Sequence, residues 1–152
     1  MAANKITTVA NSSLWVAAAS PLTFDAAGFA ALTWIKVGEV TDMGTVNCRE
    51  YNTSSHAPID TALQVEKKAS YKLGNAEFKL GWDESDAGQV IVNAASLNTT
   101  IPSFKVLKSN GAIRYFTAQV SKFVEELGSV DNVVQGALTL LRQTDTVLVA
   151  AT

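Results

Sequence analysis

The sequence predicts a mostly β domain with one α-helix at about residues 84–97. Three observations lead to this fold class. Short stretches of alternating apolar and polar residues recur along the chain, glycine and turn residues separate them, and one stretch alone has helical periodicity. The 152 residues are typical of a single domain, and 47% hydrophobic residues are enough to fill one core.

The composition argues against several classes of function. A net charge of −2 disfavours nucleic-acid binding, which needs clustered Lys and Arg. Cys48 is the single cysteine, so an internal disulfide is excluded. The polar residues 1–13 predict a flexible N-terminal arm rather than a signal peptide, and no stretch approaches the roughly 18 apolar residues of a membrane span.

The first half of the chain predicts strands interrupted by glycine. Strands are expected at Leu14–Ala19, Leu22–Phe24, Trp34–Val40 and Ser70–Trp82. The alternation slips at Gly38 in the third strand and at Gly74 in the fourth. Glycine at a register shift predicts a β-bulge, which bends and twists a strand, so both glycines favour a sheet curled toward a barrel.

The segment Cys48–Lys68, CREYNTSSHAPIDTALQVEKK, is the least regular part of the chain. Structureless loops longer than about 12–15 residues are uncommon in compact domains and are usually functional or disordered. Because this segment also carries apolar side chains, we expect a long assembly loop that a partner orders. Its candidate contact residues are Tyr51, Asn52, His56, Pro58, Ile59 and Leu63.

One helix is predicted within DESDAGQVIVNAASLN. Ala87, Val90, Ile91 and Ala94 have the i, i+3, i+4, i+7 spacing of one buried stripe. Asp83 is expected to be its N-cap, with acidic residues favourable in the first turn. Such a helix of three to four turns would lie on a sheet.

The rest of the chain is expected to be β structure. Ser109-Asn110-Gly111 predicts a hairpin between Phe104–Lys108 and Ala112–Val124. In the second of these strands, Phe116, Ala118 and Val120 face one side and Thr117, Gln119, Ser121 and Glu125 face the other. Further strands are expected within Val130–Arg142 and at Thr146–Ala150.

We predict no enzyme activity, no cofactor and no metal site. His56 stands alone, whereas a catalytic histidine needs a nucleophile or a carboxylate fixed beside it. Asp83, Glu84 and Asp86 could suggest a metal site, but their spacing also suits a helix N-terminus, and a calcium loop needs a longer series of ligands. Phosphate-binding and dinucleotide-binding glycine motifs do not occur.

Four stretches occur in a characteristic order between about Leu14 and Val149. They are VGEVTDMG, the EYN…H.P spacing in REYNTSSHAP, the K-x-x-Y of KKASYKLGNAEFKL, and GSVDNVVQGALTL after YFTAQV. In their order and in the lengths between them, the chain resembles the major tail tube protein of long-tailed bacteriophages with non-contractile tails. The resemblance covers the whole domain.

This resemblance implies a β-sandwich or barrel-like tail-tube fold with one flanking α-helix, and a structural protein that self-assembles. Copies would form hexameric rings that stack into a tail tube, and strands of neighbouring copies would join in one barrel around a lumen that carries DNA during ejection. The implied partners are further copies of the chain, the tape measure protein, the tail terminator and the tail tip proteins, with no membrane. The implied location is the virion, after synthesis in the host cytoplasm.

The resemblance also assigns roles to residues. Gly38 and Gly74 would bend strands into the shared wall, and the loop at 48–68 would reach an adjacent ring or subunit. The face of Thr117, Gln119, Ser121 and Glu125 would line the lumen. We expect this lumen to be neutral to acidic, because a basic wall would retain DNA by releasing its counterions.

Two alternatives stay open. The first is the inner-tube protein of a contractile tail or of a type VI-like injection machine, which has a similar fold and would need a surface for the sheath. The second, of another class, is a monomeric β-sandwich module that binds a carbohydrate or protein ligand. The oligomeric state separates the assembling proteins from the monomeric module.

Overall fold

The computed structural model describes residues 6–151, so most of the predicted N-terminal arm at 1–13 is described and its first five residues lie outside. The described chain holds ten strands and two helices. In order they are β1 Ser13–Ala17, α1 Ala26–Ala30, β2 Ile35–Val37, β3 Val40–Asp42, β4 Arg49–His56, β5 Val65–Leu73, β6 Ala76–Gly81, α2 Ala87–Ser96, β7 Ser103–Leu107, β8 Ile113–Glu126, β9 Gln135–Arg142 and β10 Val147–Val149.

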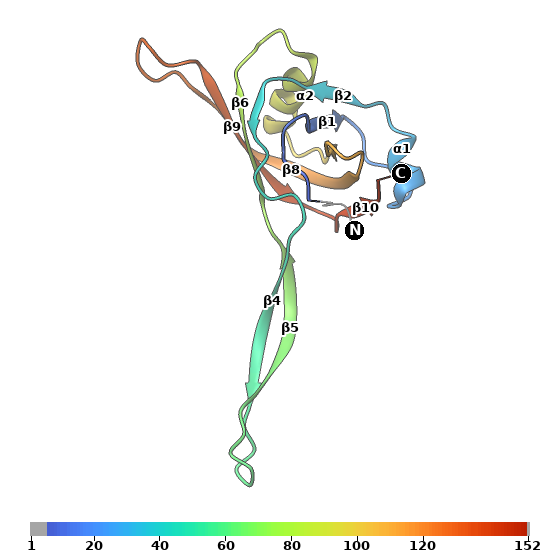
Figure 1. Cartoon of the computed structure of the whole chain (residues 1–152), viewed down its shortest axis with the longest axis vertical. Coiled ribbons are helices and arrows are strands. Elements are labelled where there is room, and N and C mark those ends of the chain that lie inside the picture. Colours follow the sequence, from blue (N-terminus) through green and yellow to red (C-terminus); the bar gives the residue numbers. More distant parts are fainter. Residues whose placement is uncertain (1–5, 152) are drawn as a thin grey trace, which may run out of the picture.

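Eight strands form an antiparallel sheet in the order β2-β1-β7-β8-β9-β6-β3, with β10 also paired to β8. The long strand β8 belongs to both halves of this sheet: its residues 113–117 pair with β7, and its residues 118–126 pair with β9. The sheet curls around a single core, and α2 lies against it (Figure 1). The predicted fold class, mostly β with a sandwich and a flanking helix, is confirmed.

The core draws on both halves of the sheet. Phe104 of β7 and Phe116 of β8 stack with ring centres 5.7 Å apart, and both are fully buried. Phe78 and Leu80 of β6 meet them from the other half, and α2 adds Val92. Fully burying one such side chain contributes about 1.5–3 kcal/mol, so this cluster carries much of the stability of the body.

The helix α2 differs from its prediction in its first residue and in its buried face. The helix is capped by Asp86, not by Asp83, and the buried positions are Gly88, Gln89, Val92 and Ala95. Val90, expected to be inside, is 53% exposed. A glycine and a glutamine occupy inward positions, and this hides the phase of the helix from a reading of apolar periodicity.

Polar contacts explain why a glutamine points inward. Gln89 is 3% exposed, and its Nε2 donates to the carbonyl oxygens of Gly38 and Gly81 at 3.2 and 2.9 Å. The carboxylate of Asp86 accepts from the backbone N–H groups of Gln89 and Gly38 at 3.0 and 3.1 Å. Asp86 and Gln89 therefore join the start of α2 to the point where the chain passes from β2 to β3.

The two glycines predicted to form β-bulges lie instead where strands end. Gly38 separates β2 from β3, and a Cβ there would lie 2.8 Å from Asp86 Oδ1. Gly74 separates β5 from β6, and a Cβ there would lie 2.8 Å from Cys48 Sγ. Close packing, rather than a bulge, favours glycine at both places. Register shifts occur between Val40 and Asp42, Tyr51 and Thr53, and Val120 and Lys122.

Of the other predicted elements, some are confirmed and one is wrong. The hairpin at Ser109-Asn110-Gly111 is confirmed, with Gly111 at φ 91°, and the closing strand is β10. Leu22–Phe24 is not a strand but leads into α1, where Asp25 accepts from the N–H of Gly28 at 2.7 Å. Phe29 of α1 then stacks on Tyr115 of β8 at 5.2 Å, so this unpredicted helix covers one end of β8.

We predict that Asp86→Ala lowers the free energy of unfolding by about 1–2 kcal/mol, because it removes the helix cap and the acceptor for Gly38. Asp83→Ala is the matched control, since Asp83 accepts only within its own turn, from Ser85. Denaturant unfolding measures both. Equal losses in the two variants would contradict the assignment of Asp86 as the cap.

Candidate assembly surfaces

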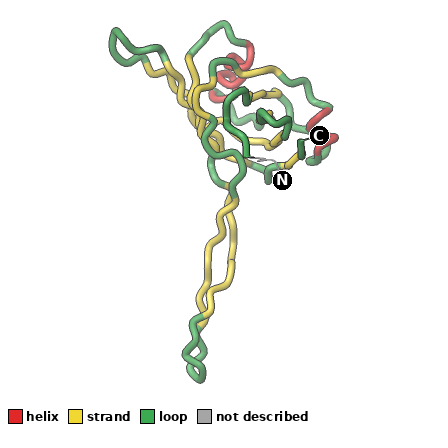
Figure 2. Tube along the Cα trace, viewed as in Figure 1, coloured by secondary structure: helices red, strands yellow, loops and turns green. Residues whose placement is uncertain are grey.

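The segment predicted to be an irregular loop is a long hairpin. Strands β4 and β5 pair only with each other, and the hairpin of residues 49–73 projects from the lower end of the body (Figures 1 and 2). Residues 57–64 form its tip, where the N–H of Ala62 donates to the carbonyl of Pro58 at 2.8 Å. The prediction was wrong because both faces of the hairpin are polar, which removes the apolar alternation that marks a half-buried strand.

One face of the long hairpin carries alternating cations and aromatic rings. Tyr51 and Tyr71 lie directly opposite each other with ring centres 5.3 Å apart. The guanidinium of Arg49 lies 4.4 Å from the ring centre of Tyr71, and Lys68 Nζ lies 4.5 Å from that of Tyr51. Exposed contacts of this kind contribute about 0.5–1 kcal/mol each, so they help to hold a ribbon that lacks a core.

The six candidate contact residues are spread along the long hairpin rather than gathered in one site. Tyr51, Asn52 and His56 belong to β4, and Asn52 donates to Ser70 Oγ at 3.1 Å. Pro58, Ile59 and Leu63 lie in the tip, where Ile59 is 100% exposed and Leu63 is 64% exposed. Two apolar side chains, Ile59 and Leu63, are therefore left in solvent at the end of a polar shaft.

Three contacts fasten the base of the long hairpin to the turn that follows β9. Arg49 pairs with Asp145 through two guanidinium nitrogens. Arg142 Nη2 donates to the carbonyl of Thr45 at 2.8 Å, and Thr146 Oγ1 donates to the carbonyl of Val46 at 3.3 Å. Together they fix the direction in which β4 leaves the body.

Arg142 is an unusual member of this base. It is 7% exposed, and burial lowers the pKa of its guanidinium. In the described chain it has no carboxylate partner, and its Nε has no hydrogen-bond partner. The guanidinium of Arg142 instead donates to the hydroxyl of Thr146 and to the carbonyl of Thr45, and it lies 5.4 Å from the ring centre of Phe116. The alternation of Gly136, Leu138 and Leu140 continues to Arg142, so the strand periodicity puts this arginine on the core side although its charge disfavours burial.

The candidate lumen face of β8 requires two corrections. Thr117 is 1% exposed and bonds to Thr144 Oγ1 at 3.0 Å, so it does not face an open surface of the subunit. Glu125 lies on the same side as Phe123 and the core, because the register shift between Val120 and Lys122 reverses the alternation. Gln119 and Ser121 stay on the outer side, and Lys122 joins them.

The outer side of β8, β9 and β6 carries charges of both signs. Lys122 lies across from Thr139, which lies across from Glu77, and the neighbouring row holds Val124, Ala137 and Lys79. Lys122 was not among the predicted lumen residues, because the bulge between Val120 and Lys122 was not predicted. The apolar Phe123, three residues after Val120 instead of two or four, is the signal that could have revealed it.

β8 also presents a free edge. Within the described residues, β7 pairs with β8 only at 113–117, so the edge of residues 119–126 opposite β9 has no partner strand. The segment after α2 contacts the beginning of this edge, where Gln119 Nε2 donates to the carbonyl of Thr99 at 3.2 Å. In the rest of the edge, backbone N–H and C=O groups without a partner strand can pair with another chain.

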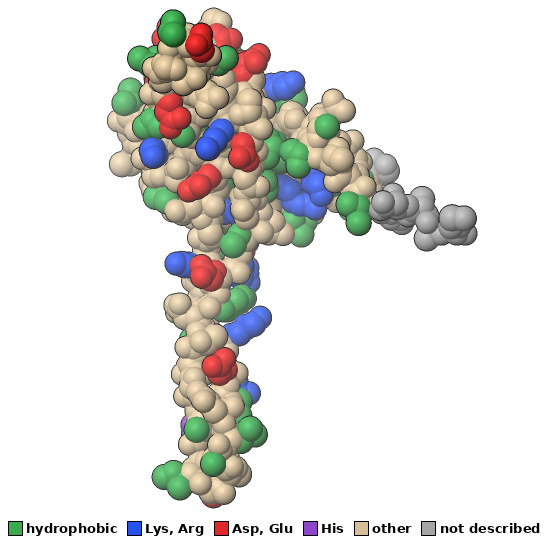
Figure 3. Space-filling view, turned by 60° about the vertical axis from the view of Figure 1, so that its left-hand side comes forward, with side chains coloured by type: hydrophobic (Ala, Val, Ile, Leu, Met, Phe, Trp, Pro, Cys, Tyr) green, Lys and Arg blue, Asp and Glu red, His purple; other side chains and the backbone are tan. Residues whose placement is uncertain are grey.

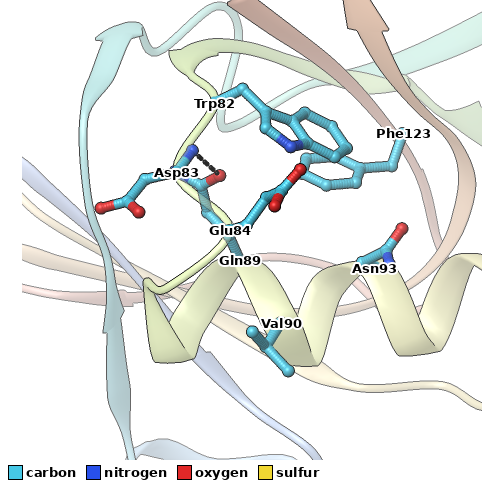
Figure 4. Close-up of a pocket in the computed structure, with 7 residues that line it drawn as sticks. All are labelled: Trp82, Asp83, Glu84, Gln89, Val90, Asn93 and Phe123. Atoms are coloured by element: carbon cyan, nitrogen blue, oxygen red, sulfur yellow. Dashed lines mark hydrogen bonds between the residues drawn. The ribbon is translucent and has the colours of Figure 1, made fainter.

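A small cavity of about 90 Å³ lies between α2 and the end of β6 (Figure 4). The indole of Trp82 stacks on Phe123 with ring centres 4.7 Å apart and forms one wall of this cavity. The buried Nε1 of Trp82 has no hydrogen-bond partner among the described residues. Glu84 and Asn93 are among the polar residues of its lining. The lining offers no nucleophile paired with a base, so the cavity does not suggest a catalytic centre.

Two further features are absent from the residues that the structure describes. No group of three or more His, Cys, Asp or Glu side chains there is placed to hold a metal ion. No helix in that part of the chain has the length and apolar character needed to cross a membrane.

Comparison with solved structures shows the fold to be that of chains from contractile injection particles. The chain is similar to the PVC sheath/tube terminator in the extended state of an extracellular contractile injection system, with 11% identity, 98% of this chain and 100% of that chain covered, and a TM-score of 0.67. It is also similar to a chain of the anti-feeding prophage baseplate, with 8% identity, 100% of this chain and 99% of that chain covered, and a TM-score of 0.69.

A third similar chain comes from the PVC sheath–tube complex in the extended state, with 10% identity, 97% of this chain and 93% of that chain covered, and a TM-score of 0.66. No family model and no curated protein matches the chain. The neighbours are structural proteins of tubes and caps, and the likeness in fold extends over nearly the whole of both chains.

We predict that Arg49→Ala loosens the base of the long hairpin without unfolding the body. Backbone amides of residues 45–50 should exchange hydrogen faster, because the pair with Asp145 is lost. Lys72→Ala is the matched control, since Lys72 contacts Glu50 of the same hairpin at 3.7 Å and does not reach the body. Unchanged exchange in Arg49→Ala would contradict the role given to this pair.

Proposed function

We propose that this chain is a structural subunit of a tail-like tube, assembled from many copies of itself. The observation that carries the proposal is the long hairpin, which leaves the body with both faces exposed and, within residues 6–151, pairs with no third strand. A single two-stranded hairpin is at best marginally stable in water, and further strands or a packed surface are needed to hold it. Other copies of the chain would supply that surface.

The free edge of β8 supports the same proposal. A closed barrel is the one arrangement that removes strand edges altogether, and a barrel shared between copies would pair residues 119–126 with a neighbouring subunit. Six-fold rings stacked into a tube would provide both a partner strand and a covering surface. The edge of β8 would pair with a neighbouring copy within a ring, and the long hairpin would contact a copy in the next ring.

Of the two machines considered from the sequence, the tube of a contractile injection system has the better support. The similar solved chains come from contractile particles, whereas the sequence motifs resemble proteins of non-contractile tails. We therefore propose the inner tube or its terminating ring in a contractile, phage-tail-like particle. Its outer surface would then face a sheath.

The remaining assignments follow from this role. The tube would be a conduit, with Gln119, Ser121 and Lys122 on its inner wall beside charges of both signs. A wall without one dominant charge would let DNA or another charged cargo pass without binding it. Proteins that cap the tube, determine its length or form its tip would be its further partners, and the assembled particle would be its location.

We predict that the subunit needs the long hairpin for assembly but not for folding. Replacing Asn52–Ser70 with Asn-Gly would join Tyr51 to Tyr71 through a two-residue turn, since these residues are directly opposite. The shortened protein should keep the circular dichroism of the body and fail to form rings or tubes in electron micrographs.

The control replaces only Asp60-Thr61 with Asn-Gly, which keeps the shaft and its length. It should assemble as the unaltered chain does. Normal tubes from the shortened protein would contradict the proposal. A stable monomer of the unaltered chain at all concentrations, with a bound ligand, would favour the monomeric binding module instead.

A further inference from the structure

A second hollow, of about 350 Å³, opens at one end of the core. Three segments that are far apart in sequence surround it: residues 7–12 before β1, residues 43–47 between β3 and β4, and the region where β7 turns into β8. We call it the mouth hollow, and six of its lining residues carry the argument: Ser12, Met43, Val46, Val106, Lys108 and Arg114.

The inner wall of the mouth hollow is apolar. Val106 is 3% exposed and belongs to the core, and Met43 and Val46 pack against that core from the segment between β3 and β4. Pockets for small organic molecules have volumes of about 300–1,000 Å³, are mostly apolar, and contain a few polar groups that converge. The mouth hollow agrees with this description in its size and in its inner wall.

The pairing register puts two cations on the side of the sheet that faces the mouth hollow. Val106 of β7 lies directly opposite Arg114 of β8, so both side chains project from the same face. Lys108 follows Val106 by two residues and is on that face too, and its N–H donates to the carbonyl of Ala112 at 2.8 Å. Lys108 and Arg114 are thus diagonal neighbours, about 7–8 Å apart, and both can reach one anion.

Neither cation is neutralised within the part of the chain that the structure describes. No carboxylate there lies within ion-pair distance of Lys108 or Arg114, and the described lining contains no Asp or Glu. Arg114 Nη1 donates only to the carbonyls of Ile113 and Val149, at 3.1 and 3.5 Å, and Ser12 adds a hydroxyl. Figure 3 shows a group of blue side chains on the body near the beginning of the chain. An anion in the hollow would therefore meet two positive charges and no negative one.

We propose that the mouth hollow binds a small amphipathic anion, a carboxylate or phosphate ester with an apolar body. The oxyanion accepts hydrogen bonds from Lys108 and Arg114, and the apolar body lies against Met43, Val46 and Val106. Carboxylates and phosphate esters share this chemistry, so the test includes one of each. The inference needs only the folded subunit and does not rest on the proposed function.

A bound anion would also hold the segment 43–47 against β7 and β8. This segment leads into the long hairpin, and its carbonyls at Thr45 and Val46 already accept hydrogen bonds from Arg142 and Thr146. A ligand that binds only the closed arrangement stabilises it by mass action. Backbone amides of residues 43–47 should therefore exchange hydrogen more slowly when the hollow is filled.

The test measures binding by isothermal titration calorimetry. Octanoate and octyl phosphate are the probes, and acetate, inorganic phosphate and octanol each lack either the apolar body or the oxyanion. Both probes should bind at least about tenfold more tightly than these three compounds. Lys108→Gln and Arg114→Gln should each weaken the binding of octanoate by about tenfold, because a charge-assisted hydrogen bond is lost.

Lys36→Gln is the matched control, since it removes the same charge from an exposed residue of β2 outside the lining. It should bind octanoate as the unaltered chain does, and circular dichroism should be unchanged in all three variants. Tighter binding of one probe than of the other would support the inference and identify the oxyanion. Octanoate that binds no more tightly than acetate or octanol, equal affinity in Lys108→Gln, or unchanged exchange at residues 43–47 would overturn it.

Discussion

The backbone pairing of β8 is the constraint on which the rest of the body depends. Fourteen residues run through both halves of the sheet, paired with β7 and β10 at one end and with β9 at the other. Phe116 packs on Phe104 in the first part, and Phe123 packs on Trp82 in the second. A register shift between them keeps aromatic residues on the core side along the whole strand. The same strand leaves a free edge and an outer polar face.

A body closed in this way can carry an extension that is not stable alone. The long hairpin has no core of its own, and its base is fastened by Arg49, Arg142 and Thr146 to the rigid turn after β9. These contacts at the base fix the direction of the long hairpin relative to the body. Under the proposed function, other copies of the chain would pair with the free edge of β8 and cover the long hairpin.

Local sequence patterns were enough for the fold class, the hairpin at Asn110-Gly111 and the existence of α2, because each depends on neighbours in the chain. The face of α2 could not be predicted, since Gln89 is buried by contacts with carbonyls that are distant in sequence. The bulge after Val120 could not be predicted either, and it puts Glu125 on the opposite side of the strand from the predicted lumen face. The long hairpin was not predicted, because neither of its faces is covered within one subunit and its strands therefore lack an alternating apolar pattern.

The most direct test of the account is a cryo-EM reconstruction of the protein assembled at high concentration. The account predicts stacked rings, with density for residues 49–73 lying against the body of another copy and the edge of residues 119–126 paired with a neighbouring strand. An assembly in which the long hairpin projects freely into solvent, while copies meet through other surfaces, would contradict it.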